Sequence, residues 1–319
     1  MTDKKTYNHL CEKNQLPVFF HPWWLDIVAP NQWKVFYARK GDEITGIMPV
    51  AEEQKGIFKF LKMPVLTPFL GVWFLYPEKQ NYHNRLSFEK EVIYQLLEKL
   101  PSYHNFNARF HERFTNWLPF YWKGCHQTTR YTYIIRYRNY NSFDELQKQF
   151  SSRVLRNVKK ALKHQVSVEE AVEVSEFLEL NKATFRRQGL QVPYSQTVVE
   201  KLFNEGKKRQ KVRIFTAYTS DKKAAASVFL VESNQTVYYL MGGISEEYKH
   251  TEANTLLFYE VIKRMFNEGK IEFNFEGSMI QSIEAYFRSF GAEQTPYYQI
   301  ARTPSRILRW YKIITNTYP

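Results

Sequence analysis

Cysteine is scarce in this chain of 319 residues, which contains Cys11 and Cys125 and no other. Two cysteines so far apart in the sequence exclude a disulfide framework and a metal cage built from cysteines. Long apolar runs are missing as well, because the longest, residues 65–76, is interrupted by Pro68 and Gly71. A run of this length is too short to cross a bilayer, which takes about 20 residues.

Signals for secretion and several catalytic signatures are also missing. Residues 1–20 are polar and hold no apolar segment of the secretory kind. There is no His-Glu-x-x-His motif, no Gly-x-Ser-x-Gly elbow and no P-loop. We therefore expect no metal centre, no serine hydrolase and no P-loop nucleotide site. The expected setting is reducing and cytoplasmic.

Acidic residues are in the minority, since 45 lysines and arginines against 32 aspartates and glutamates give a net charge of +13. Most of the excess lies in two segments, residues 130–165 and 297–319. The first has nine basic and two acidic residues, and the second has four basic residues and no acid. Such concentrations indicate surfaces for anionic partners, although solvated helix faces produce the same pattern.

Three blocks of sequence recur in the same order in the two halves of the chain. The first is a strand and turn at residues 35–38 and 214–217. The second is a helical stripe, Phe88, Val92 and Leu96, repeated as Phe258, Ile262 and Phe266. The third matches Phe120, Gly124, Gln127, Thr128 and Tyr131 to Phe287, Gly291, Gln294, Thr295 and Tyr298. We predict a duplication with an N-terminal half at 1–140, a connecting helix at 141–165 and a C-terminal half at 166–319.

The C-terminal half has the clearer pattern of secondary structure. Its periodicity predicts helices at residues 174–188 and 196–207 and strands at 212–218, 224–232 and 236–241. A helix from Asn254, as its N-cap, to before Gly269 comes next. A strand at 271–275, a helix at 280–289 and a strand at 297–302 follow. This order predicts an α/β fold in which helices pack on a mixed sheet.

The connecting segment, residues 142–164, is predicted to form one helix with a capping box of Ser142 and Glu145. Its apolar stripe comprises Phe150, Val154, Val158 and Leu162. A neighbouring face carries Arg153, Arg156, Lys160 and Lys163. We expect these cations to line a cleft between the halves and to bind a polyanion.

The element order, the strand into Asn274-Phe275-Glu276-Gly277-Ser278 and the ending Tyr286-Phe287-Arg288-Ser289-Phe290-Gly291-Ala292 resemble the GNAT superfamily. The duplication, with the basic segment Arg156-Asn157-Val158-Lys159-Lys160-Ala161, is similar to Fem-type aminoacyltransferases and related bacterial acetyltransferase-like proteins. The resemblance covers most of the chain. It implies two tandem GNAT-like domains and the transfer of an acyl group to an amine.

The sequence departs from both families at the donor site. GNAT enzymes carry a glycine-containing loop that binds the pyrophosphate of coenzyme A, but residues 246–253 contain three acids and no glycine. Fem-type enzymes lack that loop and take aminoacyl-tRNA, but they usually add a coiled-coil arm, and no sustained heptads occur here. Acyl-CoA and aminoacyl-tRNA therefore both stay open as donors.

The strand at residues 271–276 alternates apolar and polar side chains, so its polar residues should share the face away from the core. Position near the carboxyl end of this strand favours Asn274, Glu276 and Ser278 as catalytic residues, with Glu276 as the base. The alternative is that residues 276–278 form only a turn and a helix cap.

Further roles follow from the resemblance. Tyr286 would protonate a leaving group, and Arg288 would hold a phosphate or carboxylate of the acceptor. The backbone at the end of the third strand would contact the acyl carbonyl, since glycine allows close approach. The predicted donor site comprises Met241, Gly242, Gly243 and Asn254. The alternatives are a core tyrosine, a surface arginine and a plain Gly-Gly turn.

We expect an acyltransferase that forms an amide with the help of a carboxylate base. An aminoacyl-tRNA-dependent transferase acting on a cell-wall precursor is the alternative enzyme. A non-catalytic module that binds nucleic acid or another polyanion is a third possibility, although aromatic side chains for base stacking do not line the cationic face. Expected partners are a phosphate-bearing donor, acyl-CoA or tRNA, and an anionic acceptor, held by Arg153, Arg156, Lys160 and Arg288.

The C-terminal segment at residues 305–315 combines apolar side chains with cations. Its apolar face comprises Ile307, Tyr311 and Ile314 with Trp310 beside them, and Arg306, Arg309 and Lys312 surround it. A basic amphipathic helix of this kind can lie on an anionic membrane surface. We expect burial against the domain in preference to peripheral membrane contact.

Overall fold

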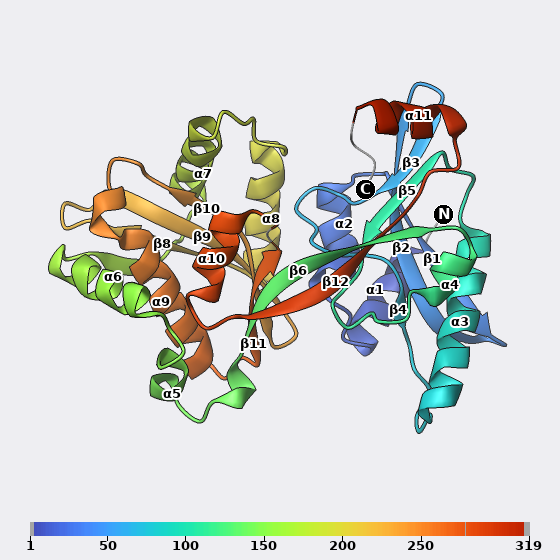
Figure 1. Ribbon diagram of the computed structural model, residues 1–319, viewed down its shortest axis with the longest axis horizontal. Coiled ribbons are helices and arrows are strands. Elements are labelled where there is room, and N and C mark those ends of the chain that lie inside the picture. The colour runs from blue at the N-terminus through green and yellow to red at the C-terminus, as the bar shows by residue number, and fades with distance from the viewer. Residues whose placement is uncertain (1–2, 278, 316–319) are drawn as a thin grey trace. The chain divides into compact units, whose positions relative to one another are not determined.

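Two strands, β6 (His126–Arg136) and β12 (Glu293–Arg302), carry the chain from one structural unit to the other (Figure 1). The computed structural model describes residues 3–277 and 279–315. Unit 1 ends at Arg130 and resumes at Pro296, and unit 2 is Tyr131–Thr295. These boundaries differ from the predicted halves. Most of β6, the last strand of the N-terminal half, belongs to unit 2, and most of β12, in the C-terminal half, belongs to unit 1. The predicted connector, 141–165, belongs to unit 2.

Unit 1 is built on a mixed sheet. Its helices are α1 (Lys4–Lys13), the 3₁₀ turn η1 (Val18–Phe20), α2 (Pro22–Val28), α3 (Tyr82–Lys99), α4 (Leu118–Trp122) and α11 (Arg306–Ile314). Its strands are β1 (Trp33–Lys40), β2 (Glu43–Lys55), β3 (Phe58–Lys62), β4 (Trp73–Phe74), β5 (Asn105–Arg109) and the end of β12. Strands β1 to β3 form an antiparallel meander, and β5 pairs parallel to β3 and antiparallel to β12.

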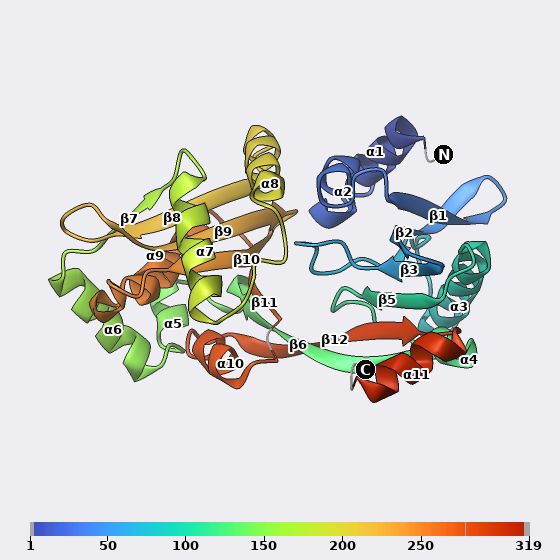
Figure 2. The ribbon, with the colours of Figure 1, turned by 90° about the horizontal axis from the view of Figure 1, so that it is seen from above.

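Both faces of the sheet in unit 1 are covered because its strands alternate apolar residues on each side. On one face the helices α3 and α4 contribute Val92, Leu96 and Phe120 to the core. On the other face α1 and α2 contribute the fully buried Tyr7 and Trp24. Figure 2 shows α1 and α2 on the opposite side of the sheet from α3.

Unit 2 repeats this architecture with additional elements. Its helices are α5 (Phe143–Gln147), α6 (Ser152–Lys163), α7 (Ser175–Arg187), α8 (Gln196–Lys208), α9 (Ala253–Asn267) and α10 (Gln281–Arg288), with the 3₁₀ turns η2 (Tyr137–Asn139) and η3 (Lys249–Thr251). Its own strands are β7 (Ser167–Glu170), β8 (Val212–Tyr218), β9 (Ala224–Ser233), β10 (Thr236–Ile244) and β11 (Glu272–Gly277). The spatial order is β7-β8-β9-β10-β11-β6, and β10 and β11 are parallel.

Helices cover both faces of the sheet in unit 2 as well. Helices α6, α9 and α10 pack on the face that carries Phe215 and Leu230. Helices α7 and α8 cover the other face, where the Phe177 ring lies 5.5 Å from that of Phe229 (Figure 2). Both apolar faces of the strands are thereby removed from water, which is the main stabilising term in such a layered fold.

The predicted duplication of the fold is confirmed by the order of elements. The sequence α1-α2-β1-β2-β3-α3-β5-α4-β6 is matched by α7-α8-β8-β9-β10-α9-β11-α10-β12. Gly124, between α4 and β6, and Gly291, between α10 and β12, both adopt a φ of +75°. Only glycine adopts this left-handed conformation without steric cost, which explains why the repeat retains it in both turns.

The single helix predicted for residues 142–164 is wrong, because two helices, α5 and α6, occupy this segment. Ser142 caps the first, as predicted, and Ser151 caps the second by accepting a hydrogen bond from the Val154 N–H. Leu162 is exposed, while Ala161 is fully buried in its place. Steps of four residues advance by more than one turn of 3.6, so the predicted stripe drifts off the buried face.

Among the described residues, no helix is long and apolar enough to cross a membrane.

Candidate functional site in unit 2

The parallel strands β10 and β11 separate soon after they meet. Within the described chain their register pairs Thr236–Tyr238 with Glu272–Asn274, after which β10 continues along β9 to Ile244. The register of β10 against β9 shifts between Tyr239 and Met241, and that of β11 against β6 shifts after Asn274. Since ligands of open α/β sheets bind beyond the carboxyl ends of parallel strands, this separation marks the candidate site.

Gly242 and Gly243 lie within β10. The alternative interpretation, a plain Gly-Gly turn after the strand, is therefore wrong. A Cβ atom at Gly242 would overlap the hydroxyl of Tyr239. A Cβ atom at Gly243 would overlap the backbone of α7 at Leu180 and Asn181. The two glycines therefore allow a helix and a tyrosine to approach the strand backbone closely.

Asn181 connects this backbone to a pocket. Its Nδ2 donates a hydrogen bond of 2.8 Å to the carbonyl oxygen of Gly242, and its Oδ1 accepts one of 3.1 Å from the hydroxyl of Tyr194. The Asn181 side chain is buried, and burial also raises the pKa of Tyr194. A fixed amide with both ends bonded thus orients the carbonyl of Gly242.

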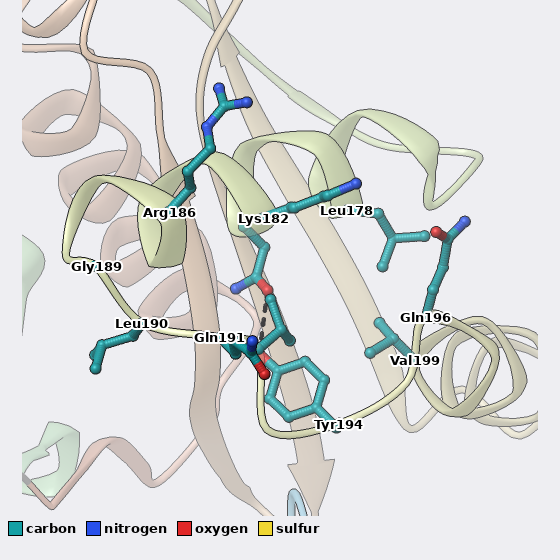
Figure 3. Close-up of a pocket in the computed structure, with 11 residues that line it drawn as sticks. Leu178, Lys182, Arg186, Gly189, Leu190, Gln191, Tyr194, Gln196 and Val199 are labelled. Carbon is teal, nitrogen blue, oxygen red and sulfur yellow. Dashed lines mark hydrogen bonds between the residues drawn. The ribbon is translucent and has the colours of Figure 1, made fainter.

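The pocket has a volume of about 590 Å³ and lies between α7, α8 and the segment that joins them (Figure 3). Figure 3 shows Leu190 and Tyr194 on the segment that connects the two helices. Leu178, Leu190, Val192 and Val199 line it with apolar surface, and Lys182 and Arg186 add positive charge. A pocket with these walls suits a ligand with an apolar part and an anionic group.

The sequence analysis did not single out this pocket. Asn181 lies in the middle of a predicted helix, and Tyr194 lies in the segment after it. Gly189, with a φ of +68°, ends α7 and turns the chain back across it. The available signal was this glycine followed by Pro193 and Tyr194, which indicates a structured connection between two helices.

Tyr286 and Asn254 are brought together on the other side of the strand ends. The Asn254 Nδ2 donates a hydrogen bond of 2.8 Å to the hydroxyl oxygen of Tyr286. The predicted N-cap role of Asn254 is wrong, because α9 begins at Ala253 after Glu252, which has a φ of +60°. Burial raises the pKa of Tyr286 well above its ordinary value, so this phenol stays protonated.

Aromatic rings pack between Tyr239 in β10 and Tyr286 in α10. The ring of Phe258 lies 4.9 Å from that of Tyr239 and 5.8 Å from that of Tyr286. Burial, with a smaller contribution from Tyr194, raises the pKa of Tyr239. The rings of Tyr239 and Tyr286 are therefore held by the same aromatic cluster at the strand ends, while the ring of Tyr194 contacts that of Phe185.

Glu252 provides an anion at the N-terminus of α9. Its carboxylate accepts a hydrogen bond of 2.9 Å from the Asn157 side chain and lies 3.8 Å from the Lys160 ammonium, both on α6. A negative charge is favourable here because the first amides of a helix carry partial positive charge. The segment before α9, which in GNAT enzymes carries the glycine-containing loop, thus carries a carboxylate in this chain.

The remaining cations of α6 face solvent. Arg153, Arg156, Lys159 and Lys163 are exposed, and no carboxylate of the described residues pairs with them. Helix α6 lies within unit 2, where it packs on α9. This row of charges continues from Lys160 beside Glu252 along the helix, so it forms a basic surface next to the Tyr286 group.

The residues predicted on β11 have mixed surroundings. Asn274 is buried, and its Oδ1 accepts hydrogen bonds from the Thr132 hydroxyl and the Glu276 N–H. Glu272 and Asn274 are both buried, so the polar face of β11 is not exposed to solvent at these two positions. Glu276 is half-buried and has a φ of +61°, which its bond to Asn274 supports. Ser278 lies outside the described residues.

Arg288 lies apart from this group. It is exposed on α10 and donates a hydrogen bond of 2.8 Å to Glu284, one turn earlier in the helix. In the described part of the chain, no group of three or more histidine, cysteine, aspartate or glutamate side chains could hold a metal ion.

The sequence and the fold define a class of protein. The family model of the acetyltransferase (GNAT) domain matches residues 148–312, and the chain belongs to this family. It is a GNAT-type N-acyltransferase with two tandem GNAT-like domains. A comparison with curated proteins finds no match.

Solved structures with the same fold are similar over nearly the whole chain. FemX has a TM-score of 0.65 at 13% identity, covering 93% of this chain and 96% of that one. L-PGS from Bacillus licheniformis has a TM-score of 0.61 at 10% identity, covering 98% and 96%. A tandem GNAT protein from the clavulanic acid biosynthesis pathway has a TM-score of 0.50 at 10% identity, covering 91% and 94%. At these identities the similarity concerns the fold.

Proposed function

We propose that unit 2 forms an amide by direct transfer of an acyl or aminoacyl group to an amine at the carboxyl ends of β10 and β11. The observation that carries this proposal is the bond from Asn181 to the carbonyl of Gly242. It connects the backbone where the strands separate to a pocket of about 590 Å³. An acceptor in that pocket would have its amine close to an acyl group lying along β10.

In the proposed reaction, one residue accepts the proton of the amine and another donates a proton to the leaving group. The amine nitrogen attacks the acyl carbon, and Glu276 takes the proton that the nitrogen loses. The backbone of Met241 and Gly243 orients the acyl carbonyl. The bond to the leaving group then breaks, and Tyr286 gives the leaving atom its proton. Because the Tyr286 oxygen accepts from Asn254, its own hydrogen stays available for this donation.

Asn274 is a positioning residue in this proposal. Its side chain holds the N–H of Glu276 in a backbone conformation that residues other than glycine seldom adopt. A carboxylate base must keep one orientation during proton transfer, and the buried amide supplies that constraint.

The basic surface of α6 supports a donor with several phosphates. Glu252 favours aminoacyl-tRNA over acyl-CoA, because a pyrophosphate at the N-terminus of α9 would have to displace this carboxylate from Asn157 and Lys160. A tRNA would instead extend along Arg153 and Arg156, which are exposed. FemX and L-PGS from Bacillus licheniformis are structural relatives of this chain.

The acceptor follows from the pocket lining. Lys182 and Arg186 suit a carboxylate or phosphate, and the apolar wall suits a hydrocarbon part. An amine-bearing cell-wall precursor has this combination of groups and is the acceptor class that we propose.

Binding and transfer experiments test the donor. Labelled tRNA and acetyl-CoA are titrated against the wild type, Arg153→Glu/Arg156→Glu and Glu252→Gln. For a tRNA donor we expect the double variant to weaken tRNA binding about fivefold and Glu252→Gln to leave it unchanged. Tighter acetyl-CoA binding by Glu252→Gln, with no tRNA binding by the wild type, would reject the tRNA donor. Mass spectrometry of a panel of amines with each donor would reject the reaction itself if no amide forms.

A further inference from the structure

Helix α11 is attached to unit 1 in a fixed orientation. Ser305 caps it, and its Arg309 and Lys312 side chains donate hydrogen bonds of 3.0 and 3.2 Å to the carbonyl and hydroxyl oxygens of Thr303. Thr303 is buried, and its hydroxyl accepts a bond of 2.9 Å from Asn105 in β5. The helix therefore has a defined inner side, which includes the partly buried Leu308 and Lys312.

The outer side of α11 is apolar. Ile307, Trp310, Tyr311 and Ile314 follow the i, i+3, i+4, i+7 spacing of one helix face. Their exposed fractions are 68%, 67%, 63% and 80%. The expected burial of this segment is wrong, since no residue of α11 is buried. A continuous apolar face left in water is unfavourable and indicates an interaction surface.

The charges beside this face identify the partner. Arg306 is exposed next to it, Arg309 is exposed while bonded to Thr303, and residues 303–315 contain no acid. A second copy of the chain would bring these cations against each other, and RNA would leave the apolar side chains in water. An anionic bilayer accommodates both the apolar face and the cations, because apolar side chains enter the acyl boundary while arginines contact lipid phosphates. Tryptophan and tyrosine favour this interfacial depth.

We propose that α11 docks the protein on the surface of a membrane that contains anionic lipids. The axis of the helix lies in the plane of the membrane, with Trp310 and Ile314 inserted and Arg306 at the headgroups. Figures 1 and 2 show α11 on the outside of unit 1. This proposal does not depend on the acyl-transfer chemistry proposed for unit 2.

Co-sedimentation with vesicles tests the docking. The full chain is mixed with phosphatidylcholine vesicles with and without phosphatidylglycerol, at low and high salt. We expect the wild type to bind the anionic vesicles at least about tenfold more strongly, and high salt to weaken that binding. Trp310→Ser/Ile314→Ser should lower it at least about tenfold, and Arg306→Gln should lower it less.

Ile57→Ser is the matched control, because Ile57 is 76% exposed in the turn after β2 and carries no such role. Control and variants should have the same melting temperature as the wild type. Equal vesicle binding by Trp310→Ser/Ile314→Ser and wild type would overturn the proposal, as would no binding by the wild type. A dimer in light scattering that the double variant dissociates would instead assign the face to a second copy.

Discussion

At the carboxyl ends of their parallel strands, the two units differ in what occupies the space. In unit 1, β3 and β5 pair at Phe60 and Leu61, and the chain then closes the site itself. The N–H of Arg109 bonds the Met63 sulfur, and the Arg109 carbonyl bonds the Leu70 N–H. The cavity left there is about 10 Å³. The pocket of about 590 Å³ in unit 2 lies between α7 and α8, and unit 1 has a pocket of about 570 Å³ lined by α1 and β1. A volume of 10 Å³ holds at most one water molecule.

The repeat thus retains the scaffold in both units, whereas the polar groups of the candidate site lie in unit 2. Phe120 and Phe287 are both buried, and Gly124 and Gly291 share one conformation. The residue before each phenylalanine differs, however, since Pro119 in α4 corresponds to Tyr286 in α10. The proposed chemistry is therefore assigned to unit 2.

The largest effect is expected from the proposed base. Glu276→Gln should lower turnover by about 10²-fold or more, because it removes proton acceptance without changing the size of the side chain. Steady-state rates with a saturating donor measure this. Lys62→Gln, at the closed strand end of unit 1, is the control and should stay within about twofold of wild type. Unchanged turnover in a folded Glu276→Gln protein would remove this residue from the mechanism.

A pH effect on stability is expected from unit 1. Burial, with a smaller contribution from Arg113, lowers the pKa of His111 to about 3. Its Nδ1 accepts a hydrogen bond from the Arg113 N–H, and its ring packs edge-on against Phe69, so the folded state holds it neutral. In the unfolded chain the pKa of this residue is near 6.5. The stabilisation that comes from keeping His111 neutral is therefore fully present above that pH and is lost as the pH falls toward 3.

Between pH 7 and pH 5 this histidine should cost about 2 kcal/mol of unfolding free energy. Urea denaturation at the two pH values measures the loss. The His111→Phe variant cannot titrate at this position. Its unfolding free energy should therefore fall by about 2 kcal/mol less than that of the wild type between these pH values, whatever its stability at pH 7. An equal loss in the variant and the wild type would assign the acid sensitivity to other groups.

A smaller catalytic effect is expected at the phenol. Tyr286→Phe should lower turnover about tenfold, because the ring is kept and only the proton donor is lost. Since burial raises the pKa of Tyr286, its ionisation should cause no loss of wild-type activity at neutral pH. Tyr121→Phe, in the corresponding helix of unit 1, is the control. Equal rates for both variants would contradict the difference between the units.

The smallest effect is expected on the basic surface of α6. Arg153→Glu/Arg156→Glu should weaken donor binding about fivefold and reduce its salt dependence. The melting temperature should stay within about 2 °C, because exposed charges contribute little to stability. Lys160→Glu is a poorer test, since it would also repel Glu252. A large fall in melting temperature would show that the two arginines are structural.

Periodicity predicted most of the elements of unit 2 because their apolar stripes are regular. The strand at residues 212–218 has those bounds in the structure, and α7 to α10 differ from prediction by a residue or two at their ends. Local pattern could not predict that Ser151 would start a new helix, since its cap also depends on the bond from its N–H to Ser289. Exposure of α11 likewise depends on tertiary packing and not on its own sequence.

The candidate site was only partly predictable. Residues on strand ends, such as Gly242 and Asn274, could be found because a known element order locates them. Asn181 and Glu252 could not, because their roles arise from contacts with Gly242 and Asn157, far away in the sequence. Single polar residues in helices carry no local signal of such partners.

Hydrogen exchange with and without bound donor tests the difference between the units most directly. The account predicts slower amide exchange at residues 241–244 and 252–256 of unit 2 when tRNA or acyl-CoA is bound, since the donor would cover these backbone groups. Residues 61–64 and 82–86, the corresponding places in unit 1, should exchange at the same rate in both states. Protection confined to these unit 1 segments would contradict the assignment of catalysis to unit 2.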